Sequence, residues 1–126
     1  MLFRSKAWGP EDGKPFLGLH GWLDNANTFD KLAPLLPGNI HFIAIDFPGH
    51  GKSSHRWPGM SYIVFEYVAD VKKVVSQLKW KRLSIIAHSM GADVASMYAG
   101  SFPSEVENLV LIDYRVGVPQ IGRAHV

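Results

Sequence analysis

One serine in the sequence stands in a pattern that could make it a nucleophile. Ser89 lies in the run Ala87-His88-Ser89-Met90-Gly91, so a small residue stands two positions away on either side. A strand-length apolar segment precedes it and a helix is expected to follow. A tight strand-to-helix turn of this kind, a nucleophile elbow, needs small flanking residues and exposes the serine hydroxyl above the sheet. The pattern predicts covalent catalysis through Ser89, with an ordinary helix-capping serine as the alternative.

The elements that would position Ser89 alternate between short apolar runs and longer amphipathic runs. Strands are predicted at 6–8, 15–19, 40–45, 83–87 and 109–112. Helices are predicted at 27–36, from a cap at Ser61 to Leu78, and from Met90 to about Ser101. Strands that are apolar along their whole length are typical of parallel sheets with helices on both faces. The predicted fold class is therefore α/β, with a doubly wound, mostly parallel sheet.

Four motifs follow one another in an order that resembles the α/β-hydrolase superfamily. They are His20-Gly21-Trp22, Asp46 to Ser53, the run around Ser89, and Leu109 to Asp113. Within that superfamily, the segments 19–25 and 78–80 resemble the serine hydrolase-like proteins. The resemblance covers roughly residues 3–113. It implies hydrolysis of small ester-like substrates through an acyl-enzyme at Ser89, and we expect no cofactor.

The resemblance also implies an oxyanion hole made of two backbone N–H groups. They map to Trp22, which follows the His20-Gly21 pair, and to Met90, which follows the nucleophile. A tetrahedral oxyanion requires two such converging donors, and the positive end of the helix from Met90 would assist them. Taken alone, His20-Gly21 could equally be a simple turn after a strand.

A serine nucleophile also needs a general base and an acid that orients it. In this superfamily the chain order is serine, acid, histidine. Asp113 is the candidate acid because it ends a strand, whereas Asp93 lies on the helix of Ser89. The histidine that follows Ser89 is His125, on a segment 114–126 that we expect to be divergent and disordered. We therefore identify no base.

These observations predict a truncated α/β-hydrolase core over 1–113 that lacks the cap and the last strands of the fold. The first interpretation is a serine hydrolase with an incomplete triad. The alternative is an inactive truncated isoform or fragment that binds a partner, or a second copy of itself, through the unpaired edge 109–112. A nucleotide-binding P-loop at Gly51-Lys52-Ser53 is disfavoured because the motif requires a glycine where Asp46 stands.

Composition excludes several other classes. The 13 basic and 11 acidic residues are spread along the chain, which argues against a nucleic-acid-binding stripe. There is no cysteine, and no histidine pair has the spacing of a zinc site, so no metal is expected. No run approaches the roughly 20 apolar residues of a membrane span, and no secretory signal is visible. The default location is therefore intracellular and cytoplasmic.

Overall fold

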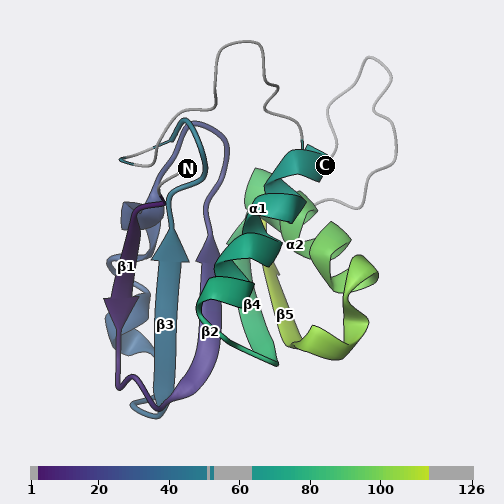
Figure 1. The fold of residues 1–126 in the computed structure, drawn as a ribbon. Coiled ribbons are helices and arrows are strands. Elements are labelled where there is room, and N and C mark those ends of the chain that lie inside the picture. Colours follow the sequence, from purple (N-terminus) through teal and green to yellow (C-terminus); the bar gives the residue numbers. More distant parts are fainter. Residues whose placement is uncertain (1–2, 51, 53–63, 114–126) are drawn as a thin grey trace.

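A computed structural model describes residues 3–50, 52 and 64–113. The described residues form a five-stranded sheet in the order β1-β3-β2-β4-β5 (Figure 1). The strands are β1 (Ser5–Trp8), β2 (Lys14–Leu19), β3 (Ile40–Ile45), β4 (Leu83–His88) and β5 (Val106–Ile112). Strand β1 runs antiparallel to β3, and the other neighbours are parallel. The helices are α1 (Val64–Gln77), α2 (Met90–Ser101) and the short 3-10 helices η1 (Ala26–Phe29), η2 (Ala33–Leu35) and η3 (Pro103–Glu105).

The predicted α/β class with a mostly parallel sheet is confirmed, but one predicted helix is wrong. The segment 27–36 contains η1 and η2 in place of a continuous helix. Pro34 lacks the N–H that a helix interior needs and disfavours helical backbone in the residue before it. The Asn25 side chain also accepts a hydrogen bond from the Asn27 N–H at 2.9 Å, which starts η1 as a separate turn. The predicted cap at Ser61 lies outside the described residues.

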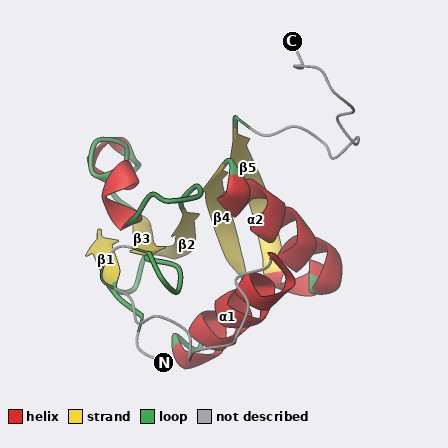
Figure 2. Cartoon of the chain, turned by 90° about the horizontal axis from the view of Figure 1, so that it is seen from above, coloured by secondary structure: helices red, strands yellow, loops and turns green. Residues whose placement is uncertain are grey.

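The sheet buries apolar side chains on both faces, because alternate residues of each strand point in opposite directions. Helices α1 and α2 lie on one face, and η1 lies on the other (Figure 2). Leu17 and Ile85 belong to the core shared with α1 and α2. Phe42 and Ile86 pack on the opposite face with Phe29 of η1. The continuous apolar strands predicted from the sequence therefore fit the layered structure.

Strand β5 is less buried than its sequence predicts. Its Leu109 and Leu111 pack against the core beneath α2, but Val110 and Ile112 are 46% and 41% exposed. Within the described part of the chain, β5 pairs with β4 alone and forms the edge of the sheet. An open strand edge with exposed apolar residues is a surface on which further chain can pair.

A polar cluster ties the two long helices to the segment that follows them. Lys72 of α1 donates a hydrogen bond to Glu105 at 2.7 Å, and the Tyr98 hydroxyl of α2 donates to the other oxygen of Glu105 at 2.8 Å. The hydrogen bond from Lys72 holds the pKa of Glu105 below its usual value. The cluster therefore fixes α1 and α2 relative to the start of β5.

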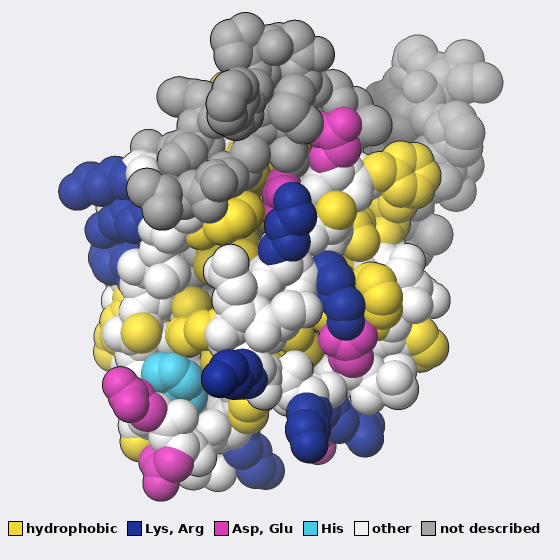
Figure 3. All heavy atoms as spheres, in the orientation of Figure 1, with side chains coloured by type: hydrophobic (Ala, Val, Ile, Leu, Met, Phe, Trp, Pro, Cys, Tyr) yellow, Lys and Arg dark blue, Asp and Glu magenta, His cyan; other side chains and the backbone are white. Residues whose placement is uncertain are grey.

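The surface carries charges of both signs. On the face seen in Figure 3, lysine and arginine side chains lie among acidic and uncharged ones. Over residues 3–50 and 64–113, no helix combines the length and the apolar character needed to cross a membrane.

Candidate active site

The ends of the parallel strands meet at one edge of the sheet, at the top of Figure 1. Four residues with polar or nucleophilic side chains each follow directly after a parallel strand. They are His20 after β2, Asp46 after β3, Ser89 after β4 and Asp113 after β5. In open α/β sheets the carboxyl edge is where ligands bind. The topology therefore gathers the predicted site residues at one place.

Ser89 occupies a strained turn between β4 and α2. Its backbone has φ 53° and ψ −115°, a combination that a non-glycine residue rarely adopts. The Ser89 N–H donates to the Ile112 carbonyl at 3.1 Å, which joins the turn to the end of β5. The Ser89 side chain makes no capping hydrogen bond to α2. The geometry thus differs from that of an ordinary helix-capping serine.

Two glycines allow the segments around Ser89 to pack closely. A Cβ atom on Gly91 would lie 2.4 Å from the Leu19 carbonyl oxygen and 2.6 Å from that of His20. A Cβ atom on Gly21 would lie 3.1 Å from His88 Nδ1 and 3.3 Å from Ser89 Cβ. The Gly91 position therefore requires a residue without a side chain, whereas a Cβ at Gly21 would require His88 or Ser89 to move by a few tenths of an ångström. The start of α2 and the turn after β2 are consequently held against each other beside Ser89.

The two predicted oxyanion donors lie on these two segments. Trp22 lies in a turn that is closed by a hydrogen bond from the Asp24 N–H to the Gly21 carbonyl at 3.2 Å. Met90 is the first residue of α2, where backbone N–H groups have no partner within the helix. Among the described residues, neither the Trp22 nor the Met90 N–H donates to a protein acceptor.

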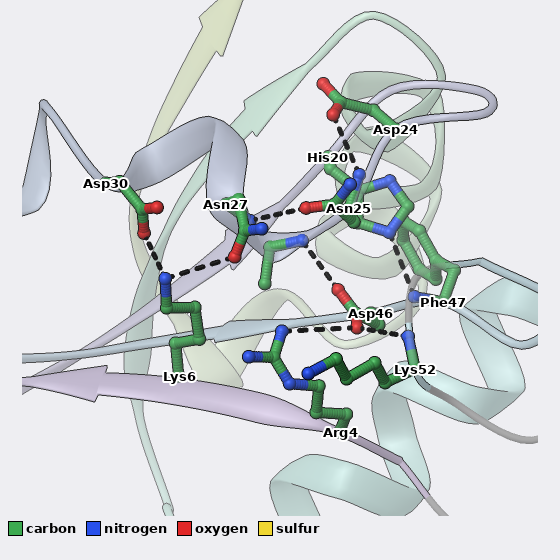
Figure 4. A network of polar contacts seen from close by, with 11 residues as sticks. Arg4, Lys6, His20, Asp24, Asn25, Asn27, Asp30, Asp46, Phe47 and Lys52 are labelled. Atoms are coloured by element: carbon green, nitrogen blue, oxygen red, sulfur yellow. Dashed lines mark hydrogen bonds and ion pairs between the residues drawn. The ribbon is translucent and has the colours of Figure 1, made fainter.

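Asp46 connects the loops that follow β2 and β3. Its carboxylate is fully buried and accepts hydrogen bonds from the Ala26 N–H at 2.6 Å and the Lys52 N–H at 2.8 Å (Figure 4). The Arg4 guanidinium lies 3.6 Å from the same carboxylate. The Lys52 N–H, which a P-loop would present to a phosphate, is therefore bound to Asp46. In the sequence analysis, Asp46 served only as the residue that does not fit the P-loop motif. Its structural role was not predicted.

His20 is a buried connection between the same loops. Its Nε2 accepts a hydrogen bond from the Phe47 N–H at 3.0 Å, so the ring proton is on Nδ1, 2.7 Å from the Gly21 carbonyl oxygen (Figure 4). Burial lowers the pKa of His20, against the opposing effect of its hydrogen bond to Gly21. His20 is thus a neutral side chain with one fixed tautomer, and it orients the turn that carries Trp22.

His88 and Asp113 form a second polar contact near Ser89. His88 Nε2 lies 3.8 Å from a carboxylate oxygen of Asp113, whose side chain is 76% exposed. His88 also borders a hollow of about 320 Å³, lined in addition by Thr28, Phe29, Leu32 and Ile112. Within the described residues, the Ser89 hydroxyl makes no hydrogen bond to a histidine. His125, the histidine that follows Ser89 in the sequence, lies outside the described part.

No three histidine, aspartate or glutamate side chains in the described ranges approach closely enough to hold a metal ion. Ser89 thus lies at this edge with the start of α2 and the turn after β2 beside it.

Comparison with known proteins identifies the family. The model of the alpha/beta hydrolase fold family matches residues 14–121, so the chain belongs to the α/β-hydrolase family. A serine hydrolase-like protein of Danio rerio is 56% identical over 110 residues, which cover 87% of this chain and 34% of that protein. A human serine hydrolase-like protein is 50% identical over 109 residues, covering 86% of this chain and 54% of that one. The predicted resemblance to this group is confirmed.

Solved structures agree with this assignment. The hypothetical protein PA1622 from Pseudomonas aeruginosa is 47% identical, with a TM-score of 0.87, and the match covers 94% of this chain and 42% of that one. A thioesterase domain from the curacin biosynthetic pathway is 30% identical, with a TM-score of 0.80 over 86% of this chain and 41% of that one. The chain thus spans between about a third and about half of the relatives it matches.

Replacing Gly91 with alanine should displace the start of α2 from the end of β2. The added Cβ would clash with two backbone carbonyl oxygens, so we expect a loss of about 3 kcal/mol or more in the free energy of unfolding. Gly100 is the matched control, because it lies in the same helix and a Cβ there meets nothing within 4 Å. Gly100→Ala should be neutral or stabilise by about 0.5–1 kcal/mol. Chemical denaturation measures both, and equal effects would contradict the packing argument.

The fold should lose stability in mild acid through His20. Its pKa in the folded chain lies below the ordinary value of 6.5, so its contribution is complete above that pH. It is lost as the pH falls below 6.5 toward the folded-state pKa, because the imidazolium cannot accept the Phe47 N–H. His20→Asn should be less stable at pH 7.5 and should lose less of its remaining stability between pH 7 and 5. If the free energy of unfolding falls equally between pH 7 and 5 in the wild type and in His20→Asn, the prediction is contradicted.

Proposed function

We propose that this chain provides the nucleophile and the oxyanion hole of a serine hydrolase that acts on ester-like bonds. The observation that carries the proposal is the left-handed backbone of Ser89, held between two segments that each offer an N–H group without an acceptor among the described residues. Strain of this kind costs of order 1–3 kcal/mol and persists where the surroundings impose it, which is common at active sites. Ser89 is accordingly interpreted as a nucleophile elbow.

The proposed reaction begins when Ser89 Oγ attacks the carbonyl carbon of the substrate and loses its proton to a general base. The carbonyl oxygen becomes an oxyanion and accepts hydrogen bonds from the Trp22 and Met90 N–H groups. The leaving group departs with a proton, an acyl-enzyme remains on Ser89, and water hydrolyses it. The similar thioesterase domain bears a name that fits this acyl-transfer chemistry.

Asp113 is the proposed acid of the triad. It follows Ile112, whose carbonyl accepts the Ser89 N–H, and it stands opposite His88. A carboxylate at this place lies at the correct edge of the sheet to orient a base. The described residues provide no such base, so catalysis requires one from another part of the protein. The intracellular location predicted from the sequence stays a prediction.

The second candidate function is that of an inactive, truncated form that associates through the edge of its sheet. The exposed apolar residues Val110 and Ile112 on the edge strand β5 favour it. A chain that folds but presents an unactivated serine would fit this alternative. The two candidates differ in the reactivity of Ser89.

A fluorophosphonate probe tests the proposal, because it labels serine hydroxyls that are activated and have an oxyanion hole. With the part of the protein that supplies the base present, we expect labelling on the peptide that contains Ser89, complete loss of labelling in Ser89→Ala, and no loss in Ser101→Ala. Ser101 is an exposed serine at the other end of the same helix. Peptide mass spectrometry identifies the labelled residue. A protein that is folded by circular dichroism but unlabelled would contradict the hydrolase and support the second candidate.

A further inference from the structure

The loop after β3 carries a histidine that the proposed reaction does not use. His50 is 6% exposed, and its backbone N–H donates a hydrogen bond to the Phe47 carbonyl oxygen at 2.9 Å. Its Nδ1 lies 3.0 Å from the Pro48 carbonyl oxygen. A carbonyl oxygen can only accept, so Nδ1 carries the ring proton. The other ring nitrogen, Nε2, is buried and has no hydrogen-bond partner within residues 3–50, 52 and 64–113.

The His50 ring lies at the centre of an aromatic group. Its centroid is 5.3 Å from that of His20 and 6.2 Å from that of Tyr67, and both of these side chains are fully buried. On its outer side, the Trp22 ring lies 5.2 Å away with an interplanar angle of 71°. Edge-to-face contacts at such distances are favourable for aromatic rings. His50 therefore links the buried core of the loops to Trp22.

The Trp22 side chain lies mostly outside the core. Its side chain is 55% exposed, and His50 is its ring-contact partner among the described residues. Its backbone lies in a turn closed by one 3.2 Å hydrogen bond, and Leu23 in that turn has φ 61°. An oxyanion donor acts only when its nitrogen lies at about 2.7–3.1 Å from the developing anion. A ring contact that holds this turn would therefore help to keep the Trp22 N–H within such limits.

We propose that His50 is a positioning residue for the oxyanion hole: its imidazole supports the Trp22 indole and so fixes the direction of the Trp22 N–H. This inference rests on the proposed function and adds a residue to that site. His50 touches neither the substrate nor Ser89 in this account. It acts through Trp22, in the same way that His20 acts through the Gly21 carbonyl.

The first test is the second-order rate of Ser89 labelling by a fluorophosphonate. His50→Ala should lower the rate at least tenfold, up to the roughly 10²–10³-fold effect of losing one oxyanion donor. His50→Phe keeps a ring beside Trp22 and should recover most of the rate. His41→Ala is the control, because it removes another buried histidine, one packed edge-on against Trp80 at 6.2 Å. An unchanged rate in His50→Ala, or His50→Phe as slow as His50→Ala, would overturn the proposal.

The second test does not depend on activity. The chain has four tryptophans, so selective ¹⁵N labelling gives four tryptophan backbone amide signals, and Trp22→Phe assigns that of Trp22. His50→Ala should lower the ¹⁵N order parameter of the Trp22 amide, because its turn loses the ring contact, and leave that of the Trp80 amide unchanged. His41→Ala should not affect Trp22. Equal order parameters at Trp22 in the wild type and in His50→Ala would overturn the proposal.

The two tests separate the two claims. If the wild-type chain is never labelled but the Trp22 amide responds to His50, the proposed function fails and the positioning role stands. If labelling occurs and neither readout responds to His50, the positioning role fails alone. His50→Phe, which keeps an aromatic ring in the buried position, keeps both readouts usable if His50→Ala does not fold.

Discussion

The close approach between the end of β2 and the first turn of α2 is the constraint on which the proposed site depends. Gly91 lies so near the Leu19 and His20 carbonyl oxygens that no side chain fits between them. Because the helix begins this close to the strand, the chain between β4 and α2 has room only for a sharp turn. Ser89 takes up that turn with its left-handed backbone. The same approach brings the turn of Trp22 beside Ser89, so the positions of the proposed nucleophile and of both proposed oxyanion donors follow from one contact.

Buried polar groups fix the loops that this contact brings together. Asp46 is a fully buried carboxylate, and burying this charge without hydrogen-bond donors would cost free energy. It accepts hydrogen bonds from backbone N–H groups of the loops that follow β2 and β3. His20 joins the loops a second time in a single neutral tautomer. Neither group faces the substrate in the proposed reaction. They hold the backbone still, and preorganised backbone donors are what stabilise an oxyanion.

The sequence was sufficient for the features that depend on neighbouring residues. The strands could be predicted because each is a continuous apolar run, and the turn at Ser89 because small residues flank it within two positions. The structure of segment 27–36 could not be predicted in this way. Its apolar spacing indicated one continuous helix, whereas Pro34 and the Asn25 side chain divide it. The contacts of Asp46 with Ala26 and of His20 with Phe47 join residues 20 and 27 positions apart. No local sequence pattern predicts such pairs, so the residues that fix the loops around the proposed site could be identified only from the three-dimensional structure.

The central claim is that Ser89 lies within reach of two backbone donors, and a crystal structure of the fluorophosphonate adduct measures this directly. The phosphoryl oxygen of the adduct occupies the place of the oxyanion. The account predicts that this oxygen lies about 2.7–3.1 Å from both the Trp22 and the Met90 nitrogen atoms. An adduct on Ser89 whose phosphoryl oxygen turns toward solvent, beyond hydrogen-bond distance from either nitrogen, would contradict it.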